Sequence, residues 1–214
     1  MTLKILFQER ERIKEARRRI KEDYFNKALD LSEIGLEWLP DEISELKDLT
    51  ELFLDSNQFT VIPEVICNLF NLQSLCLEFN QLTSIPDSIG NLDSLETLEL
   101  NCNQLTAIPN VIGDLTSLRT LNLNCNRLTE IPDSIGNLIN LVYLDLRGNQ
   151  LTSLPDLIGN LSNLETLYLG DNPFSLVPAV IAKLPNLKYL YLEGDTLIEI
   201  PDVISAMPNL SVYT

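Results

Sequence analysis

The chain has 214 residues, 45% of them hydrophobic, and its 31 acidic and 15 basic residues give a formal net charge of −16. Its apolar runs are short, and charges interrupt the N-terminus MTLKILFQERERIK, which argues against a signal peptide and against a membrane-spanning helix. The sequence has no histidine and no CxxC pair, so the usual ligands of a zinc site are missing. We therefore expect a cytoplasmic protein that binds no metal.

Residues 1–27 differ from the rest of the chain in composition, and they are predicted to form one amphipathic helix. Apolar side chains recur at helical intervals among charged ones, at Leu6, Ile13, Ala16, Ile20 and Tyr24. Nine basic and five acidic residues give the segment a charge of +4, which leaves −20 on residues 28–214. We interpret the helix as a cap on the repeats that follow it. The run Arg17-Arg18-Arg19 also fits nucleic acid or an anionic membrane, but the five acids beside it argue against both, while disorder and partner binding stay open.

From residue 28 onward the sequence repeats with a period of 23 residues, and residues 95–117, LETLELNCNQLTAIPNVIGDLTS, show the unit. An asparagine marks each unit, at Asn57, Asn80, Asn103, Asn126, Asn149 and Asn172, with Asp195 next in the series. A fixed period of this size is typical of a solenoid, in which each unit buries its leucines against its neighbours. The alternation in Leu98-Glu99-Leu100 predicts a short strand, and the Ile-Pro and Ile-Gly pairs predict a short helical turn.

The pattern LxxLxLxxNxLTxIPxxIGxL resembles the leucine-rich repeat family over about residues 28–214. The resemblance implies an α/β solenoid, a horseshoe with a parallel β-sheet on its concave face, short turns or 3-10 helices on its convex face, and an N-terminal capping helix. About eight full rungs and a partial ninth would follow the cap. The units QLTSIPDSIGNL and RLTEIPDSIGNL are similar to the repeats of bacterial, notably cyanobacterial, Roco proteins and of the Ras-suppressor and scribble-type group.

Both ends of the predicted array depart from the pattern. The first rung has Ile34 in place of the asparagine, and Trp38 stands where later rungs carry smaller residues, so we expect Trp38 to pack against the cap helix or the next turn. A last, incomplete rung begins at Leu210 with no recognisable cap after it. Two explanations stay open: the array continues in a longer protein, or its open edge associates with a second copy of the chain.

The four cysteines Cys67, Cys76, Cys102 and Cys125 lack the spacing of a disulfide framework, which favours reduced thiols. Cys102 and Cys125 occupy the same position in consecutive rungs. We therefore expect their Cα atoms to lie about one strand spacing apart, within the range of a disulfide.

The C-terminal half of the concave face carries the candidate binding site. We derive it from the strand positions that flank the leucines, and in this half those positions hold Tyr143, Asp145, Arg147, Tyr168, Tyr189 and Tyr191. Exposed tyrosine and arginine are favoured at the energetic centres of protein interfaces, which predicts a partner-binding patch. The alternative is that the tyrosines stack on one another and stabilise the sheet. The same columns place Val212 outward in the last rung.

The N-terminal half of the concave face is acidic, with Asp30, Glu51, Asp55, Glu78 and Glu99 in these columns. A solvated face that keeps the protein soluble is the first interpretation of this secondary patch. A basic partner is the second, and a calcium site is a distant third because no loop has the spacing of an oxygen cage.

The sequence contains no GxSxG, HExxH or GxxxxGK[ST] motif, so we expect neither enzymatic activity nor a cofactor. The resemblance implies a protein-protein interaction module that binds a protein partner on its concave face, in a signalling role. The alternative is the regulatory segment of a larger Roco-type GTPase, whose nucleotide-binding motif would lie beyond Thr214. A third possibility, a secreted surface-binding protein, requires a signal sequence before Met1.

Overall fold

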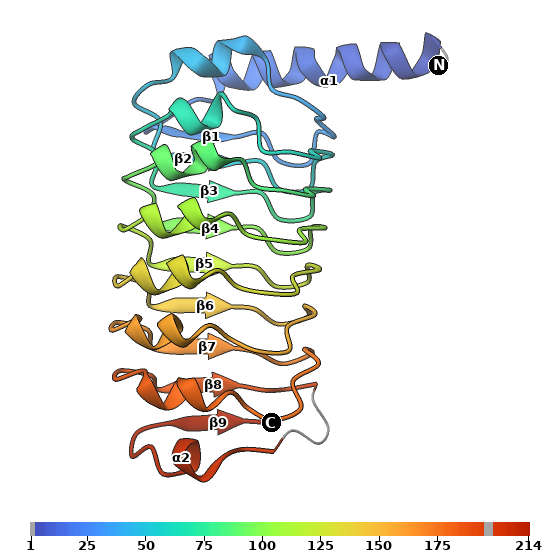
Figure 1. Ribbon diagram of the computed structural model, residues 1–214. Helices are drawn as coiled ribbons and strands as arrows, with labels where there is room; N and C mark the ends of the chain where they lie inside the picture. Colours follow the sequence, from blue (N-terminus) through green and yellow to red (C-terminus); the bar gives the residue numbers. More distant parts are fainter. Residues whose placement is uncertain (1–2, 195–198) are drawn as a thin grey trace.

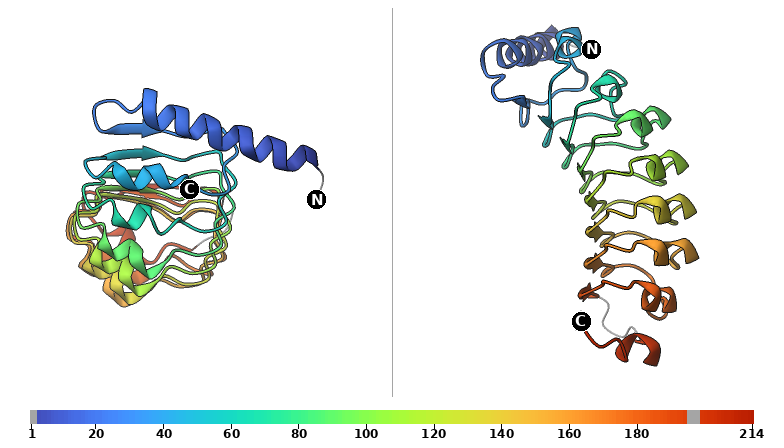
Figure 2. Two further views of the ribbon diagram at one scale, coloured as in Figure 1. Left: turned by 90° about the horizontal axis from the view of Figure 1, so that it is seen from above. Right: turned by 90° about the vertical axis from the view of Figure 1, so that its left-hand side faces the viewer.

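The computed structural model describes residues 3–194 and 199–214, so Asp195 of the repeat series lies outside the described residues, as does the side chain of Leu6. The described chain winds into a curved solenoid with strands along one side and short helices along the other (Figures 1 and 2). The expected α/β solenoid with one parallel sheet and an N-terminal helix is confirmed. No helix of the described chain is both long and apolar enough to cross a membrane.

One strand per rung builds the sheet, and the strands follow each other in sequence order, each parallel to the next. The strands are β1 (Ala28–Asp30), β2 (Glu51–Phe53), β3 (Ser74–Cys76), β4 (Thr97–Glu99), β5 (Thr120–Asn122), β6 (Tyr143–Asp145), β7 (Thr166–Tyr168), β8 (Tyr189–Tyr191) and β9 (Ser211–Tyr213). From β1 to β8 the partners are 23 residues apart, as in the pair Leu98 and Leu121. Because the repeat length is constant, equivalent residues of neighbouring rungs pair with each other, and their side chains form columns across the sheet.

The opposite side of the solenoid consists mainly of single turns of 3-10 helix, which confirms the predicted short turns. They are η1 (Asp41–Glu45), η2 (Ile66–Asn68), η3 (Asp87–Asn91), η4 (Asn110–Asp114), η5 (Asp133–Asn137), η6 (Asp156–Asn160) and η7 (Ala179–Lys183), and the short α2 (Asp202–Ser205) follows in the last rung. Proline precedes most of them, as Pro109 precedes η4, because its fixed φ suits the start of a helical turn. A Cβ on Gly113 would lie 2.5 Å from the carbonyl oxygen of Ser134, so glycine lets η4 and η5 pack closely.

The asparagine ladder joins consecutive rungs inside the solenoid. The side-chain oxygen of Asn126 accepts the N–H of Leu105, 3.0 Å away, and its amide donates to the carbonyl oxygen of Leu100 at 2.9 Å, both in the preceding rung. The same amide donates to Leu123 within its own rung. Equivalent bonds are formed by Asn57, Asn80, Asn103, Asn149 and Asn172. Each buried amide thus satisfies backbone groups that the turn leaves unpaired.

The helix α1 (Leu3–Glu22) lies across the start of the array and covers its first rung (Figure 1). Ile13, Ala16 and Ile20 are buried in the same core cluster as the repeat leucines, and the hydroxyl of Tyr24 donates to Asp48 at 2.6 Å. Ion pairs extend the contact, including Arg17 to Glu42. Burial of Ile13, Ala16 and Ile20 confirms that the N-terminal helix docks as expected. The prediction that it reaches residue 27 is wrong, since α1 ends at Glu22 and the positive φ of Asn26 and Lys27 is incompatible with a helix, so Tyr24 contacts the array from the segment after it.

Trp38 contacts α1 as expected, because its Nε1–H donates to the Glu9 carboxylate at 3.1 Å. Trp38 is 44% exposed, however, and is therefore less covered than a packing role implies.

The last rung corrects one sequence assignment. In β9, Ser211 pairs with Tyr189 and Val212 pairs with Leu190, so Val212 points into the stack and not outward. This rung has a single residue, Ser211, between Leu210 and the next inward side chain, where other rungs have two. The 23-residue period therefore does not hold in this rung. The register follows the alternation of Ser211, Val212 and Tyr213, because a slip of one residue would turn the apolar side chain of Val212 to solvent.

Candidate functional site

A column of tyrosines crosses the last strands of the sheet. The register places Tyr168 of β7, Tyr191 of β8 and Tyr213 of β9 side by side. The rings of Tyr168 and Tyr191 are stacked with centroids 4.2 Å apart and planes 8° from parallel, and those of Tyr191 and Tyr213 are 4.5 Å apart at 11°. Asp145 is the residue of β6 in register with Tyr168, but the Tyr143 ring reaches across from the adjacent position, tilted by 49° with its centroid 5.3 Å from that of Tyr168. We call these four tyrosines the tyrosine column.

An ion pair supports the column at β6. The carboxylate of Asp145 is buried, and it accepts hydrogen bonds from the backbone N–H and from the Nε–H of Arg147, at 3.0 and 3.1 Å. The guanidinium carbon of Arg147 then lies 4.3 Å from the centre of the Tyr168 ring. Asp145 therefore fixes a cation on the aromatic face, an arrangement in which the ring quadrupole attracts the charge.

Tyr143 and Tyr189 share the column of the sheet beside that of Tyr168, Tyr191 and Tyr213, and their surroundings differ. The hydroxyl of Tyr143 donates to Asp145 at 3.3 Å, and burial together with the nearby carboxylate raises its pKa. Tyr189 lies in a neighbouring column, is 41% exposed, and borders a cavity of about 300 Å³ that Lys188, Asn209 and Ser211 also line. Tyr189 thus lies at the margin of the tyrosine column.

The structure brings most of the predicted site together but changes two of its members. Asp145 was expected at the surface and is instead fully buried, so it holds Arg147 and does not itself present a charge to a partner. Tyr213 was missed because counting by 23 removes it from the column, yet it is 40% exposed and completes the stack. The alternation Ser211-Val212-Tyr213 was the signal that could have identified it. The tyrosines do stack on one another, as the alternative interpretation of the sequence expected.

The acidic half of the face forms a line of mutually repelling carboxylates. Burial raises the pKa of Asp55, Glu78 and Glu99, and neighbouring acids raise each of them further. One carboxylate oxygen of Glu78 is buried without a hydrogen-bond partner among the described residues.

The two remaining acidic residues of the predicted patch behave differently. Asp30 accepts hydrogen bonds from Ser32 and lies 3.8 Å from Arg19 of the cap helix, so part of its charge is neutralised. Glu51 is exposed. The five acidic residues therefore differ in burial and in charge pairing, and they do not form a single cluster.

The arrangement is suited to recognition by contact. Rigid stacked rings offer apolar area at a low cost in conformational entropy, and Arg147 adds a fixed cation beside them. Acidic side chains continue the same face toward the N-terminal end, where they would favour a partner with complementary positive charge.

Comparisons with known proteins agree with the geometry. The family model described as "Leucine-rich repeat region" matches residues 24–132 and 131–213. The chain is similar to the solved structure of a leucine-rich repeat protein of Leptospira interrogans, with 34% sequence identity over 92% of this chain and a TM-score of 0.82. It is also similar to the plant peptide hormone receptor RGFR1 in complex with RGF2, with 31% identity over 81% of this chain and a TM-score of 0.69. A comparison with curated proteins finds no match.

The chain spans 56% of the Leptospira structure and 29% of the plant receptor chain. These findings support the repeat family and do not confirm the narrower resemblance to the Roco or scribble-type group.

Proposed function

Because this chain belongs to the leucine-rich repeat family, we propose that it is a protein-binding module whose partner docks on the C-terminal half of the concave face. The observation that carries the proposal is the tyrosine column with Arg147 fixed against it. A threonine, as in β4 and β5, would serve a solvated strand equally well, whereas stacked tyrosines and a held arginine are the residue types that dominate interface energies.

The proposed interface has a defined centre and margin. Tyr168, Tyr191 and Arg147 form the centre, since Tyr168 contacts both of the others and all three are only partly buried. Tyr143, Tyr189 and Tyr213 surround them. The patch spans four strands, or three strand spacings, on the order of 15 Å, which is the scale of an energetic centre and not of a whole interface.

The test is affinity capture from a lysate of the source organism, followed by measurement of the affinity for the captured protein. The variant Tyr168→Ala/Tyr191→Ala is expected to lower that affinity at least tenfold, because it removes the central rings. The matched control is Phe70→Ala/Ile139→Ala, which removes two exposed apolar side chains from the turns after η2 and η5. Equal loss in both variants would indicate nonspecific apolar capture, and retention by the tyrosine variant would place the interface elsewhere.

The charged residues provide a second measurement on the same complex. Glu51→Lys/Glu78→Lys should change mainly the association rate and its salt dependence, because these carboxylates lie outside the proposed centre. If this pair abolishes binding while the tyrosine pair does not, the partner docks on the acidic half.

A further inference from the structure

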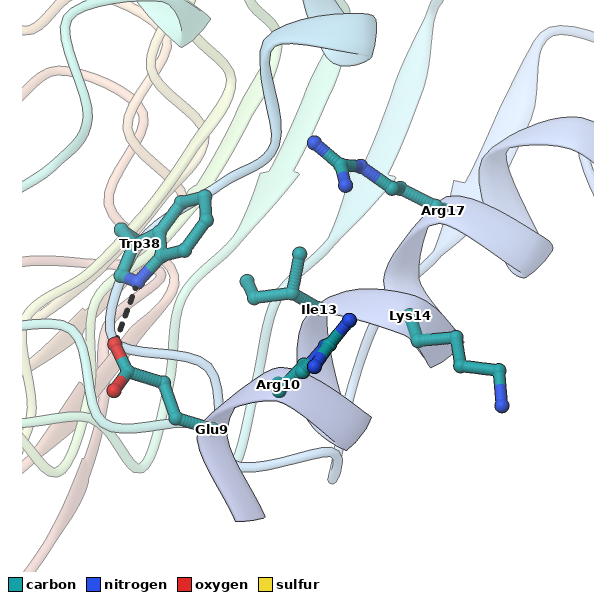
Figure 3. Close-up of a pocket in the computed structure, with 6 residues that line it drawn as sticks. All are labelled: Glu9, Arg10, Ile13, Lys14, Arg17 and Trp38. Carbon is teal, nitrogen blue, oxygen red and sulfur yellow. Dashed lines mark hydrogen bonds between the residues drawn. The ribbon is translucent and has the colours of Figure 1, made fainter. Parts of the chain in front are cut away.

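A second hollow lies at the other end of the molecule, between the cap helix and the first rung. It has a volume of about 430 Å³ and is lined by Glu9, Arg10, Ile13, Lys14, Arg17 and Trp38 (Figure 3). Five of these residues come from α1 and Trp38 comes from the loop before η1. The hollow is therefore created by docking of the cap and is separate from the tyrosine column.

The floor of the hollow is apolar. Ile13 is 7% exposed and lies between the Trp38 indole and the Arg17 side chain (Figure 3). The hydrogen bond from the indole Nε1–H to Glu9 holds the ring edge, and Trp38, which is 44% exposed, offers an aromatic surface. An indole with its polar edge already satisfied and its ring partly open is suited to an apolar ligand.

Three cations surround this floor, in a chain whose net charge is −16. Arg17 reaches Glu42 through its Nε at 2.9 Å, and Lys14 lies 3.6 Å from Glu11. Arg10 forms no ion pair with any residue of the described chain. The hollow thus combines an exposed guanidinium that has no ion pair with an apolar floor, and its three cations outnumber its one carboxylate, Glu9, which is engaged by Trp38. Positive charge above an apolar surface favours a ligand that is anionic at one end.

We propose that this hollow binds a small organic anion, in which a carboxylate, sulfonate or phosphate group meets Arg10 and Arg17 and an apolar body lies against Trp38 and Ile13. Its volume falls within the range of about 300–1,000 Å³ that is usual for small-molecule sites. The inference does not depend on the concave face, because it concerns different residues at the opposite end of the sheet.

The experiment uses the intact chain and the fluorescent sulfonate 1-anilinonaphthalene-8-sulfonate. Trp38 is the sole tryptophan of the sequence, so energy transfer from tryptophan to the dye reports binding near this hollow and not at the distant end of the array. Saturable transfer is expected. Uncharged 1-anilinonaphthalene, which has the same apolar body, should bind about tenfold more weakly because it lacks the sulfonate.

Two variants of α1 decide the assignment. Arg10→Ala should weaken dye binding about tenfold, as the loss of one charge-assisted contact implies. Lys21→Ala removes the same charge from the same helix outside the hollow and should change binding less than about twofold. Equal effects of the two variants, or equal binding of the two dyes, would overturn the proposal.

Vesicles separate a soluble anion from a lipid headgroup. Neutral phosphatidylcholine vesicles, with and without anionic phosphatidylglycerol, are not expected to change Trp38 fluorescence. A response to the anionic vesicles without saturable binding of the soluble dye would overturn the proposal in favour of a membrane surface.

Discussion

The guanidinium carbon of Arg147 lies 4.3 Å from the centre of the Tyr168 ring, one strand away across the sheet. The same guanidinium is bonded to Asp145, whose side chain is 1% exposed. One cation therefore satisfies a buried carboxylate and an aromatic face together, and the two contacts depend on each other.

Removal of this cation should be costly for the fold. Arg147→Met leaves the Asp145 carboxylate buried with the backbone N–H of residue 147 and the Tyr143 hydroxyl as hydrogen-bond partners but without its cation, at about 1–3 kcal/mol of unfolding free energy. Asp145→Asn/Arg147→Met should cost less than Arg147→Met alone, because no buried charge remains. Urea unfolding of the single and double variants measures the coupling, and additive effects would contradict the interdependence.

The ladder makes two neighbouring asparagines unequal. Asn126→Leu removes hydrogen bonds to Leu105 and Leu100 of the preceding rung, at about 1–3 kcal/mol for each group left unsatisfied. Asn124→Leu changes a partly exposed side chain on the concave face and should stay within about 0.5 kcal/mol. Thermal melts of the two variants check the difference, and equal melting temperatures would refute the ladder's contribution.

Docking of the cap helix depends on a small residue. Ala16 is fully buried under α1, so Ala16→Gln inserts a long polar side chain where there is no space, and it should lower the melting temperature and increase binding of apolar dyes. Lys21→Gln, on an exposed side of the same helix and outside the hollow beside Trp38, is the control and should leave both unchanged. If Ala16→Gln melts like the parent protein, α1 does not stabilise the array.

The acidic line predicts an unusual dependence of stability on pH. Folding raises the pKa of Asp55, Glu78 and Glu99, so the native state binds more protons than the unfolded state between their ordinary and raised values. Stability should therefore increase as pH falls from 7 toward the ordinary carboxylate range of about 4. Glu15, whose pKa is lowered to about 2, acts in the opposite direction at lower pH, where its protonation removes stabilisation.

Urea unfolding at several pH values tests this dependence. Glu78→Gln removes one of the three carboxylates and should flatten the slope. Glu51→Gln, at an exposed acid, is the control. A parent protein that loses stability steadily from pH 7 downward would contradict the raised values.

The paired cysteines should be reduced but able to form a bridge. Cys102 and Cys125 follow equivalent strands of adjacent rungs, and both take the left-handed conformation, with φ of 56° and 54°. Their Cα atoms are therefore expected about one strand spacing apart, within the range of a disulfide. Mass spectrometry after mild peroxide treatment should detect a Cys102–Cys125 bridge and leave the buried Cys67 as a thiol, whereas independent oxidation of the two sulfurs would contradict it.

Repetition explains which features could be predicted from the sequence. The leucine columns and the ladder follow from a fixed period, since any residue that returns every 23 positions must occupy the same place in each rung. The cap helix followed from its apolar stripe. Counting could not detect the shortened spacing in the last rung, and so it missed Tyr213.

Features that depend on the contact between two structural elements also could not be predicted from the sequence. Burial of Asp145 depends on where Arg147 and Tyr143 direct their side chains, which periodicity does not specify. The hollow beside Trp38 depends on the angle at which α1 crosses the first rung. Short repeats determine the positions of neighbours along the stack, but the docking of an unrelated element is determined by three-dimensional packing alone.

The ladder also has a consequence for how such a molecule can evolve. Since each asparagine bonds the rung before it, duplication of a gene segment encoding residues 95–117 would insert one complete rung between partners that already match. The concave face would lengthen by one strand spacing, about 4.8 Å. The tyrosine column and the hollow under the cap helix would then move apart by that step with neither of them altered, so the distance between the two surfaces can change in evolution independently of their chemistry.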